Sequence, residues 1–284
     1  MTVSCQAMRT IWTTLLFCTL ARAADAVLPG GNLLSCDTYS YRELLLAGKL
    51  DVMDVPALYR REGIRGISLN ERYLKSRDDA YVDRFKAATA REGRVVACFV
   101  IDGNLALADE AKRREQVAHD MESLRIAHRL GAPTVRINLG ATGKAENADD
   151  TAGVARVIAA FNQMLPLARD LNIRITIENH GGPSGSADNI LRIIKGTDPK
   201  WVGALIDFGN FPEALRYSEI AKLAPHAFFV HVKTKDNGAE YDLPRIFRML
   251  KEHNYKAPLS IEFEGRGDPV AGVRMSRELV LKNW

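Results

Sequence analysis

The chain has 284 residues, of which 46% are hydrophobic and 26% are charged, which is the composition of an ordinary globular protein. Its formal net charge of +4 arises from 39 basic and 35 acidic residues, a balance too mild for a nucleic-acid-binding protein. We therefore expect no nucleic-acid partner and one large domain, because α/β barrels commonly use about 250 residues for a single core.

Residues 1–26 differ in character from the rest of the chain. A basic residue precedes an apolar stretch over residues 11–21, and several alanines follow it. This order is typical of a secretory signal peptide. The apolar stretch is shorter than the about 20 residues that cross a bilayer, which argues against a stable membrane anchor after cleavage. We expect cleavage near Ala23 or Ala26, export to the periplasm or the medium, and a mature domain over residues 27–284.

The cysteines do not form a disulfide framework. The chain has four, and two of them, Cys5 and Cys18, fall within the predicted signal peptide. Cys36 and Cys98 remain, and each lies in an apolar run of strand length. Two cysteines in a domain of this size are too few for a disulfide scaffold, so we expect buried free thiols.

Apolar runs of strand length alternate with helical patterns through the rest of the chain. Amphipathic segments such as Asp109 to Leu130 and Thr151 to Leu171 place apolar residues at three- and four-residue steps. Strands that alternate with helices predict a parallel sheet, and eight such units predict an α/β fold, a single-domain (β/α)8 TIM barrel. The eight runs begin near Leu33, Ile64, Val95, Thr134, Ile173, Val202, Phe228 and Leu259.

Four of these runs end in a side chain that can bind a metal ion or transfer a proton: Glu178, Asp207, His231 and Glu262. They are 29, 24 and 31 residues apart, and one strand–helix unit takes about 25 to 40 residues. Because the strand ends of a barrel meet at one mouth, we expect these side chains to form a divalent metal site. A set rich in oxygen ligands with one imidazole favours Mn2+, Mg2+ or Co2+ over Zn2+.

Strand alternation predicts further polar side chains in the barrel interior. Residues at i and i+2 share a face of a strand. The polar residues of four strands share the inward phase, and unpaired charge inside a barrel is strongly unfavourable without a ligand. The additional residues predicted to face inward or toward the mouth are Arg136, Asn138, His180, Lys233 and Glu264.

Four motifs resemble those of a known family. They are Ile177-Glu-Asn-His-Gly181, Ile206-Asp-Phe-Gly-Asn210, His231-Val-Lys-Thr-Lys-Asp236 and Ile261-Glu-Phe-Glu-Gly265. In strand order and spacing the chain resembles the xylose-isomerase-like TIM barrel superfamily, in its sugar phosphate isomerase/epimerase branch. The resemblance implies that Glu178, Asp207, His231 and Glu262 bind the metal and that Glu178 and Glu262 form the acid/base pair. The residues it places near the substrate are Arg136, Asn138, His180, Asn210, Lys233 and Glu264.

The motifs depart from the family pattern at two places. Several ketose epimerases have a histidine where this chain has Asn210, and their second strand often has a glutamate near Ser68 or Asn70. Both departures concern the identity of the substrate. The apurinic endonucleases of the superfamily use additional histidines and an Asp-x-His pair for a trinuclear zinc site, and this chain has only six histidines and no such pair.

The sequence thus predicts an exported, divalent-metal-dependent sugar isomerase or epimerase. It would abstract a proton beside a carbonyl through a metal-bound enediolate. Export favours a free or oxidised sugar over a sugar phosphate. One alternative is a lyase or hydratase on a 3-keto-sugar or 3-keto-glycoside at the same metal site. Another is a non-catalytic carbohydrate-binding barrel, which would not need two opposed carboxylates. Such barrels often pair through their helices, so a homo-oligomer is compatible with the sequence.

Overall fold

The computed structural model describes Asp25 and residues 27–140, 151–236 and 239–284. Residues 1–24 and 26, most of the predicted signal peptide, lie outside the described residues, so that prediction is neither supported nor contradicted by the fold. In the described part of the chain, no helix is both long enough and apolar enough to span a bilayer.

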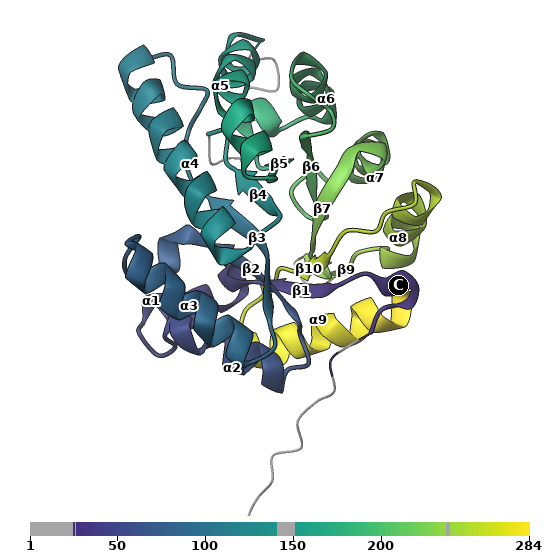
Figure 1. Cartoon of the computed structure of the whole chain (residues 1–284). Coiled ribbons are helices and arrows are strands. Elements are labelled where there is room, and N and C mark those ends of the chain that lie inside the picture. Colours follow the sequence, from purple (N-terminus) through teal and green to yellow (C-terminus); the bar gives the residue numbers. More distant parts are fainter. Residues whose placement is uncertain (1–24, 26, 141–150, 237–238) are drawn as a thin grey trace, which may run out of the picture.

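The barrel strands are β1 (Leu34–Asp37), β2 (Gly66–Asn70), β3 (Val95–Ile101), β4 (Thr134–Ile137), β5 (Arg174–Glu178), β6 (Val202–Asp207), β7 (Ala227–Val232) and β10 (Leu259–Ile261). Each strand pairs in parallel with the next, and pairing between β10 and β1 closes the ring. The order predicted from the apolar runs is confirmed, because every run forms one strand of the barrel. Figure 1 shows the strands at the centre of the molecule and the helices outside them.

The helices that follow the strands are α1 (Arg42–Leu46), α2 (Val55–Arg61), α3 (Asp79–Arg91), α4 (Glu110–Leu130), α5 (Thr151–Asp170), α6 (Ala187–Gly196), α7 (Arg216–Leu223), α8 (Leu243–Glu252) and α9 (Pro269–Asn283). The short elements are the 3-10 helices η1 (Pro29–Gly31), η2 (Thr38–Tyr41), η3 (Val52–Asp54), η4 (Glu71–Tyr73), η5 (Gly182–Ser184) and η6 (Ala224–His226), with a hairpin of β8 (Lys235–Asp236) and β9 (Ala239–Glu240). The side chain of Asp109 accepts hydrogen bonds from two backbone N–H groups at the start of α4, which explains why the helix begins there. The two helices predicted from periodicity are confirmed to within one residue at each end.

Two clusters of apolar side chains pack on the two sides of the barrel wall. The inner cluster consists of Ala97, Cys98, Val100, Leu205 and Phe229. The outer cluster joins the alternate strand residues, such as Val135 and Ile177, to the helices. The ring of Phe229 lies 6.0 Å from the imidazole of His231. The apolar interior therefore ends where the predicted site begins, and the inward phase predicted for the polar residues is the observed one. Cys36 and Cys98 are buried and free, as expected.

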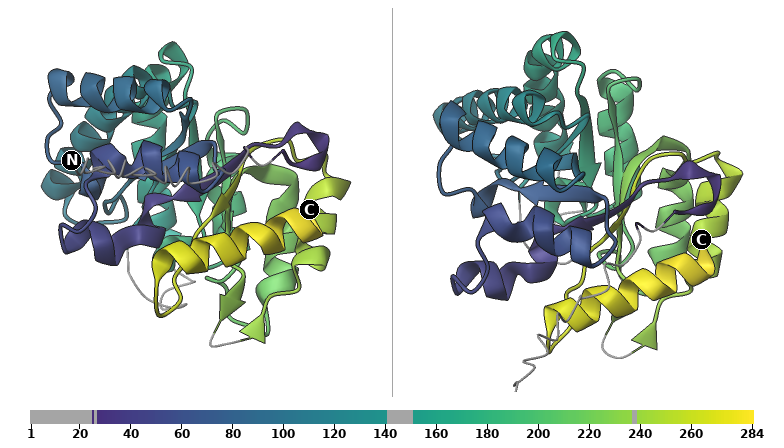
Figure 2. Two further views of the ribbon diagram at one scale, coloured as in Figure 1. Left: turned by 90° about the horizontal axis from the view of Figure 1, so that it is seen from below. Right: turned by 60° about the horizontal axis from the view of Figure 1, so that its bottom comes forward.

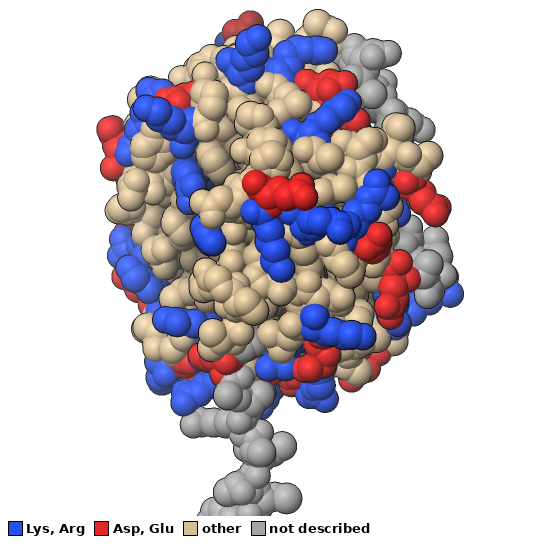
Figure 3. Space-filling model, turned by 90° about the vertical axis from the view of Figure 1, so that its right-hand side faces the viewer, with Lys and Arg blue, Asp and Glu red and all other residues tan. Residues whose placement is uncertain are grey.

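The segment before β1 packs across the amino-terminal end of the barrel. Leu28 is buried, and Val27 bridges to Leu33. The indole N–H of Trp284 donates a 3.0 Å hydrogen bond to the carbonyl of Pro29, so the end of α9 lies beside this segment in Figures 1 and 2. The described amino-terminal segment thus covers this end of the barrel, and the cavity lined by the predicted site residues lies at the opposite end. On the face in Figure 3, basic and acidic side chains are interspersed, in keeping with the balanced charge of the sequence.

An ion pair between Asp25 and Arg94 at this end of the barrel indicates that the folded domain includes Asp25. Arg94, almost fully buried, donates hydrogen bonds of 2.6 and 2.8 Å to the carboxylate of Asp25. Its guanidinium also donates to the carbonyl of Ile64. If Asp25 were removed, a buried cation would lose its counter-ion. Leaving such a charged donor unpaired costs about 1–3 kcal/mol.

Asp25→Asn is therefore expected to lower the free energy of unfolding by about 1–3 kcal/mol. Arg94 holds the pKa of Asp25 below its usual value of 3.8. The stabilisation is consequently present at pH 7 and is lost as the pH falls through the lowered pKa. Urea unfolding of the wild type and of Asp25→Asn at pH 7 and pH 3 measures the loss of stability and its dependence on pH. Asp79→Asn, which removes the largely exposed partner of Arg129, is the control and should change stability little. Equal effects of the two substitutions would contradict the role of Asp25.

Candidate metal centre and active site

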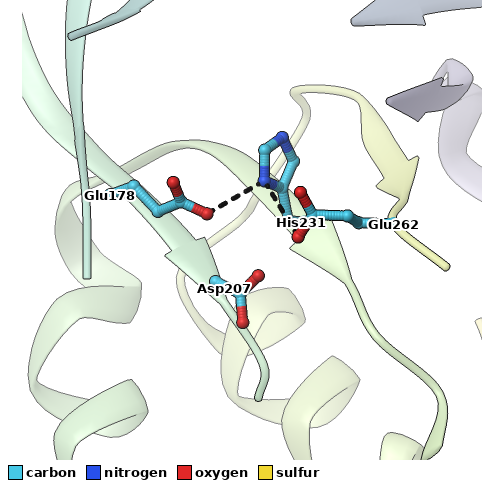
Figure 4. Close-up of side chains that lie close together, drawn as sticks. All are labelled: Glu178, Asp207, His231 and Glu262. Carbon is cyan, nitrogen blue, oxygen red and sulfur yellow. Dashed lines mark hydrogen bonds and ion pairs between the residues drawn. The ribbon is translucent and has the colours of Figure 1, made fainter. Parts of the chain in front are cut away.

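The four predicted metal ligands meet at the carboxyl ends of their strands. Glu178 ends β5, Asp207 ends β6, His231 lies in β7 and Glu262 directly follows β10. One ligand atom from each residue lies within 4.8 Å of those of the others. All four are buried, with exposures of 4%, 0%, 1% and 8%. Figure 4 shows the four side chains pointing toward one another.

Glu178 is held by two basic side chains. Its Oε2 accepts a short hydrogen bond from Nη2 of Arg136, and its Oε1 lies 3.1 Å from Nδ1 of His231. Burial by itself would raise the pKa of Glu178, but Arg136 and His231 outweigh burial and hold this pKa well below its usual range. Glu178 is therefore a carboxylate at neutral pH. Arg136, predicted to face the substrate, is also 3.3 Å from Oδ1 of Asp102.

Asp207 is fixed by its neighbours in the chain and by the end of β5. The side chain of Asn179 spans the two strand ends, donating to the carbonyl of Asp207 and accepting from its N–H. Oδ1 of Asp207 accepts hydrogen bonds from the N–H groups of Gly209 and Asn210. Its Oδ2 is buried and has no hydrogen bond, although the ammonium of Lys233 lies 3.1 Å away. One carboxylate oxygen therefore remains available to a ligand.

Lys233 lies among several of these acidic groups. Its Nζ is 3.4 Å from Oε2 of Glu262 and 3.0 Å from Oε2 of Glu264, in addition to its contact with Asp207, and it donates to Oδ1 of Asn210. A Cβ at Gly209 would lie 2.7 Å from the hydroxyl of Tyr241 and 2.8 Å from Cδ of Lys233, so a larger residue there would force these side chains to shift. Burial would lower the pKa of Lys233, but these carboxylates raise it well above its usual value.

Glu262 differs from Glu178 in its protonation. Burial raises the pKa of Glu262 well above its usual range, and the attraction of His231 and Lys233 does not compensate. Lys233 is shared with Asp207 and Glu264, and the charges of Asp207 and Glu178 oppose ionisation of Glu262. In the absence of a metal ion, Glu262 is thus the carboxyl group that retains a proton. The pKa values of Glu178 and Glu262 are thus shifted in opposite directions, which is the pattern of an acid/base pair.

The strand ends surround a cavity of about 170 Å³. Of the residues predicted to contact the substrate, Arg136, Asn138, His180, Lys233 and Glu264 line it. Asn210 does not line this cavity; it contacts Lys233 from behind. His180 precedes Gly181, whose φ of 96° is accessible mainly to glycine. Nδ1 of His180 is buried without a hydrogen bond. The substrate contacts of these six residues remain predictions.

Several cavity residues were not predicted from the sequence. Asp37 ends β1 and Asp102 follows β3, so both obey the rule that identified the four ligands. The rule that side chains at strand ends face the barrel mouth would have identified Asp37 and Asp102 if it had been applied to every strand. Tyr39 and Arg72 come from the 3-10 helices η2 and η4 after β1 and β2, where strand alternation does not apply. Their position depends on tertiary structure.

A divalent cation fits the charges and donors of this site. Six carboxylates, those of Asp207 and of five residues that line the cavity, face three cations, Arg72, Arg136 and Lys233. With every carboxyl group ionised and the imidazoles neutral, which is the state that metal binding requires, the formal charge is −3 in a largely buried space, and a divalent ion would reduce it to −1. Oδ2 of Asp207, which accepts no hydrogen bond, and the close Nδ1 of His231 are suitable ligand atoms, and an oxygen-rich set with one imidazole suits Mn2+ or Mg2+.

The sequence matches the family model for a xylose isomerase-like TIM barrel over residues 56–283. The chain belongs to this family. A search among curated proteins found no similar sequence.

Three solved structures are similar to this chain in fold. L-ribulose 3-epimerase has 18% identity and a TM-score of 0.71, covering 88% of this chain and 93% of its own. The 3-keto-D-glucoside 4-epimerase of E. coli has 17% identity and a TM-score of 0.69, covering 81% and 94%.

The third structure is a xylose isomerase-like TIM barrel protein from Mycobacterium smegmatis in complex with magnesium. It has 18% identity and a TM-score of 0.70, and covers 88% of this chain and 95% of its own. At such identities the likeness establishes the fold of this family member and leaves its reaction to be argued from its own residues.

Proposed function

We propose that this protein is a divalent-metal-dependent sugar isomerase or epimerase that moves a proton at a carbon atom beside a carbonyl group. The observation that carries the proposal is the pair Glu178 and Glu262. These glutamates come from different strands, are buried against the same imidazole, and have pKa values shifted in opposite directions. Such a pair can take a proton on one side of a substrate and return one on the other.

A bound divalent ion would polarise the substrate carbonyl and acidify the adjacent C–H bond. Glu178, kept ionised by Arg136, takes the proton from that carbon. Glu262, whose pKa burial raises, returns a proton to the resulting enediolate. Return to the opposite face of the same carbon gives an epimer, and return to the neighbouring carbon interconverts an aldose and a ketose. Glu178, Asp207, His231 and Glu262 would hold the ion, with Mn2+, Mg2+ or Co2+ preferred over Zn2+.

The charges of the cavity support a substrate without a phosphate group. Among the described residues, each cation that lines the cavity is already paired. Arg136 contacts Glu178 and Asp102, Arg72 contacts Asp102, and Lys233 contacts several carboxylates. A phosphate would have to compete with these pairs. A free sugar or keto-sugar of monosaccharide size is therefore the proposed substrate, in keeping with the names of the two epimerases of similar fold.

The proposal includes export. The amino-terminal pattern supports a cleaved signal peptide, and the ion pair between Asp25 and Arg94 favours cleavage after Ala23, because cleavage after Ala26 would remove Asp25. Mass spectrometry of the mature protein recovered from the periplasm or the medium tests this. A chain that remains in the cytoplasm at full length would contradict export.

Proton NMR in D2O tests the reaction. The mature protein, loaded with Mn2+ or with Mg2+, is incubated with free sugars, keto-sugars and 3-keto-glycosides, and the metal is removed before spectra are recorded. We expect deuterium beside a carbonyl and a new sugar of unchanged mass apart from the isotope. An unsaturated product or a released aglycone would assign the protein as a lyase instead. If no substrate exchanges deuterium with either metal, the isomerase or epimerase and the lyase assignments are both contradicted, and a carbohydrate-binding barrel is favoured.

A further inference from the structure

Asp37 is a buried carboxylate at the base of the cavity, and the proposed reaction does not use it. It ends β1, is 1% exposed, and lies on the strand that pairs with β10, the strand before Glu262. Its Oδ1 accepts a 2.7 Å hydrogen bond from the N–H of Tyr39, and its Oδ2 accepts a 2.6 Å hydrogen bond from the hydroxyl of Ser68. Ser68 lies in β2, so two neighbouring strands fix the direction of this carboxylate.

The same oxygen of Asp37 that accepts the hydrogen bond from Ser68 also faces His231. This Oδ2 lies 3.3 Å from Nε2 of the imidazole. The other ring nitrogen, Nδ1, lies 3.1 Å from Oε1 of Glu178 and 3.6 Å from Oε2 of Glu262. The two nitrogens thus face different partners. Nδ1 points into the group of ligand atoms, while Nε2 points to a carboxylate that is outside this group.

A histidine that binds a metal ion must present an unprotonated nitrogen, and the proton then resides on the other nitrogen. A carboxylate beside that second nitrogen fixes the tautomer and the ring orientation. The contact between Asp37 and His231 has the distance of an ion pair but lacks the alignment of a hydrogen bond, so Nε2 is buried without a hydrogen bond.

We propose that Asp37 is a positioning residue that holds His231 with Nε2 protonated and Nδ1 directed at the divalent ion. This rests on the metal site of the proposed function. Ser68 assists by fixing the Asp37 carboxylate. Asp37 also caps η2 through Tyr39, and a purely structural role would consist of that cap.

The substitution Asp37→Asn separates the two roles. Asparagine caps a helix about as well as aspartate, so the hydrogen bond from the N–H of Tyr39 is retained. The amide, however, presents an N–H group toward Nε2. This favours the tautomer with the proton on Nδ1, which must leave before the metal ion binds. We expect Asp37→Asn to weaken Mn2+ binding by about 10–100-fold, the usual effect of losing such a partner.

Calorimetric titration of the metal-free protein with Mn2+ at pH 7 measures the affinity, and circular dichroism checks the fold. Asp120→Asn is the matched control, because Asp120 is also a fully buried aspartate but has its partners, Gln116 and His119, on α4. It should bind Mn2+ like the wild type. Ser68→Ala keeps the carboxylate and removes its 2.6 Å donor, so we expect a smaller loss, of less than about 10-fold. This variant also tests the proposal if Asp37→Asn does not fold.

A second measurement reads the tautomer directly. In Mg2+-loaded protein with 15N-labelled histidine, the signals of His231, assigned by comparison with His231→Gln, should show a proton on Nε2 and none on Nδ1. Equal Mn2+ affinity in the wild type, Asp37→Asn and Ser68→Ala, equal losses in Asp37→Asn and Asp120→Asn, or a protonated Nδ1 in the wild type would each overturn the role of Asp37. A wild type that binds neither Mn2+ nor Mg2+ would instead remove the metal site of the proposed function.

Discussion

Replacing Glu262 with Gln is expected to lower kcat by about 10²–10⁴-fold while the barrel remains folded, because a positioned acid or base contributes about that much. Glutamine retains the size of the side chain but cannot release a proton. Burial raises the pKa of Glu262, which favours its role as the group that returns a proton to the substrate. The assay should use saturating Mn2+, since Glu262 is also a predicted ligand of the metal ion.

Exchange in D2O separates a lost proton donor from a disrupted site. In Glu262→Gln, Glu178 can still remove the substrate proton and return deuterium to the same face. The substrate should therefore acquire deuterium while no product forms, whereas Glu178→Gln should stop both. Glu62→Gln is the matched control, because Glu62 is also a buried glutamate but pairs with Arg274 outside the site. Unchanged turnover in Glu262→Gln would contradict its assigned role.

The fold was predictable because the same local rule recurs in each βα unit. Apolar runs of strand length, each followed by a helical pattern, gave all eight strands, and their parallel pairing follows from the crossovers. The hairpin of β8 and β9 was not predicted, because its strands have two residues each and no periodicity. The packing of residues 27–33 across the barrel end was not predicted either, since it depends on contacts with Tyr255, Ala257 and Trp284 far along the chain.

The site was predictable where a residue's place in a strand determines its direction. Glu178, Asp207, His231 and Glu262 end up together because parallel strand ends share one edge of the barrel. The pairing within the site was not predictable. That Arg136 binds Glu178, and that Lys233 lies between Asp207 and Glu262, depends on rotamers and on the barrel's stagger. These pairs decide which glutamate is ionised, so the assignment of acid and base required the structure.

Binding of Mn2+ is expected to stabilise the wild type and to be necessary for its activity. Six carboxylates and three cations face one another in the site, and a divalent ion relieves the excess of negative charge. At a concentration 100 times its Kd, an ion that binds only the folded state adds about 2.7 kcal/mol of stability. For a domain of this size, each kcal/mol raises Tm by about 2–4 °C. Excess chelator should remove this increment together with all turnover.

His231→Ala should lose both effects of Mn2+, because it removes the one nitrogen ligand among the four side chains. His226→Ala is the matched control, since His226 lies in η6 just before β7, at the opposite end of the same strand, and should respond to Mn2+ like the wild type. Thermal unfolding with and without Mn2+, together with the D2O assay, measures both responses. Full activity of the wild type in excess chelator would contradict the metal assignment. If Mn2+ raises the Tm of His231→Ala as much as that of the wild type, the ion binds elsewhere. The stabilisation predicted here arises only when the ion is held at the strand ends, where it compensates the excess negative charge.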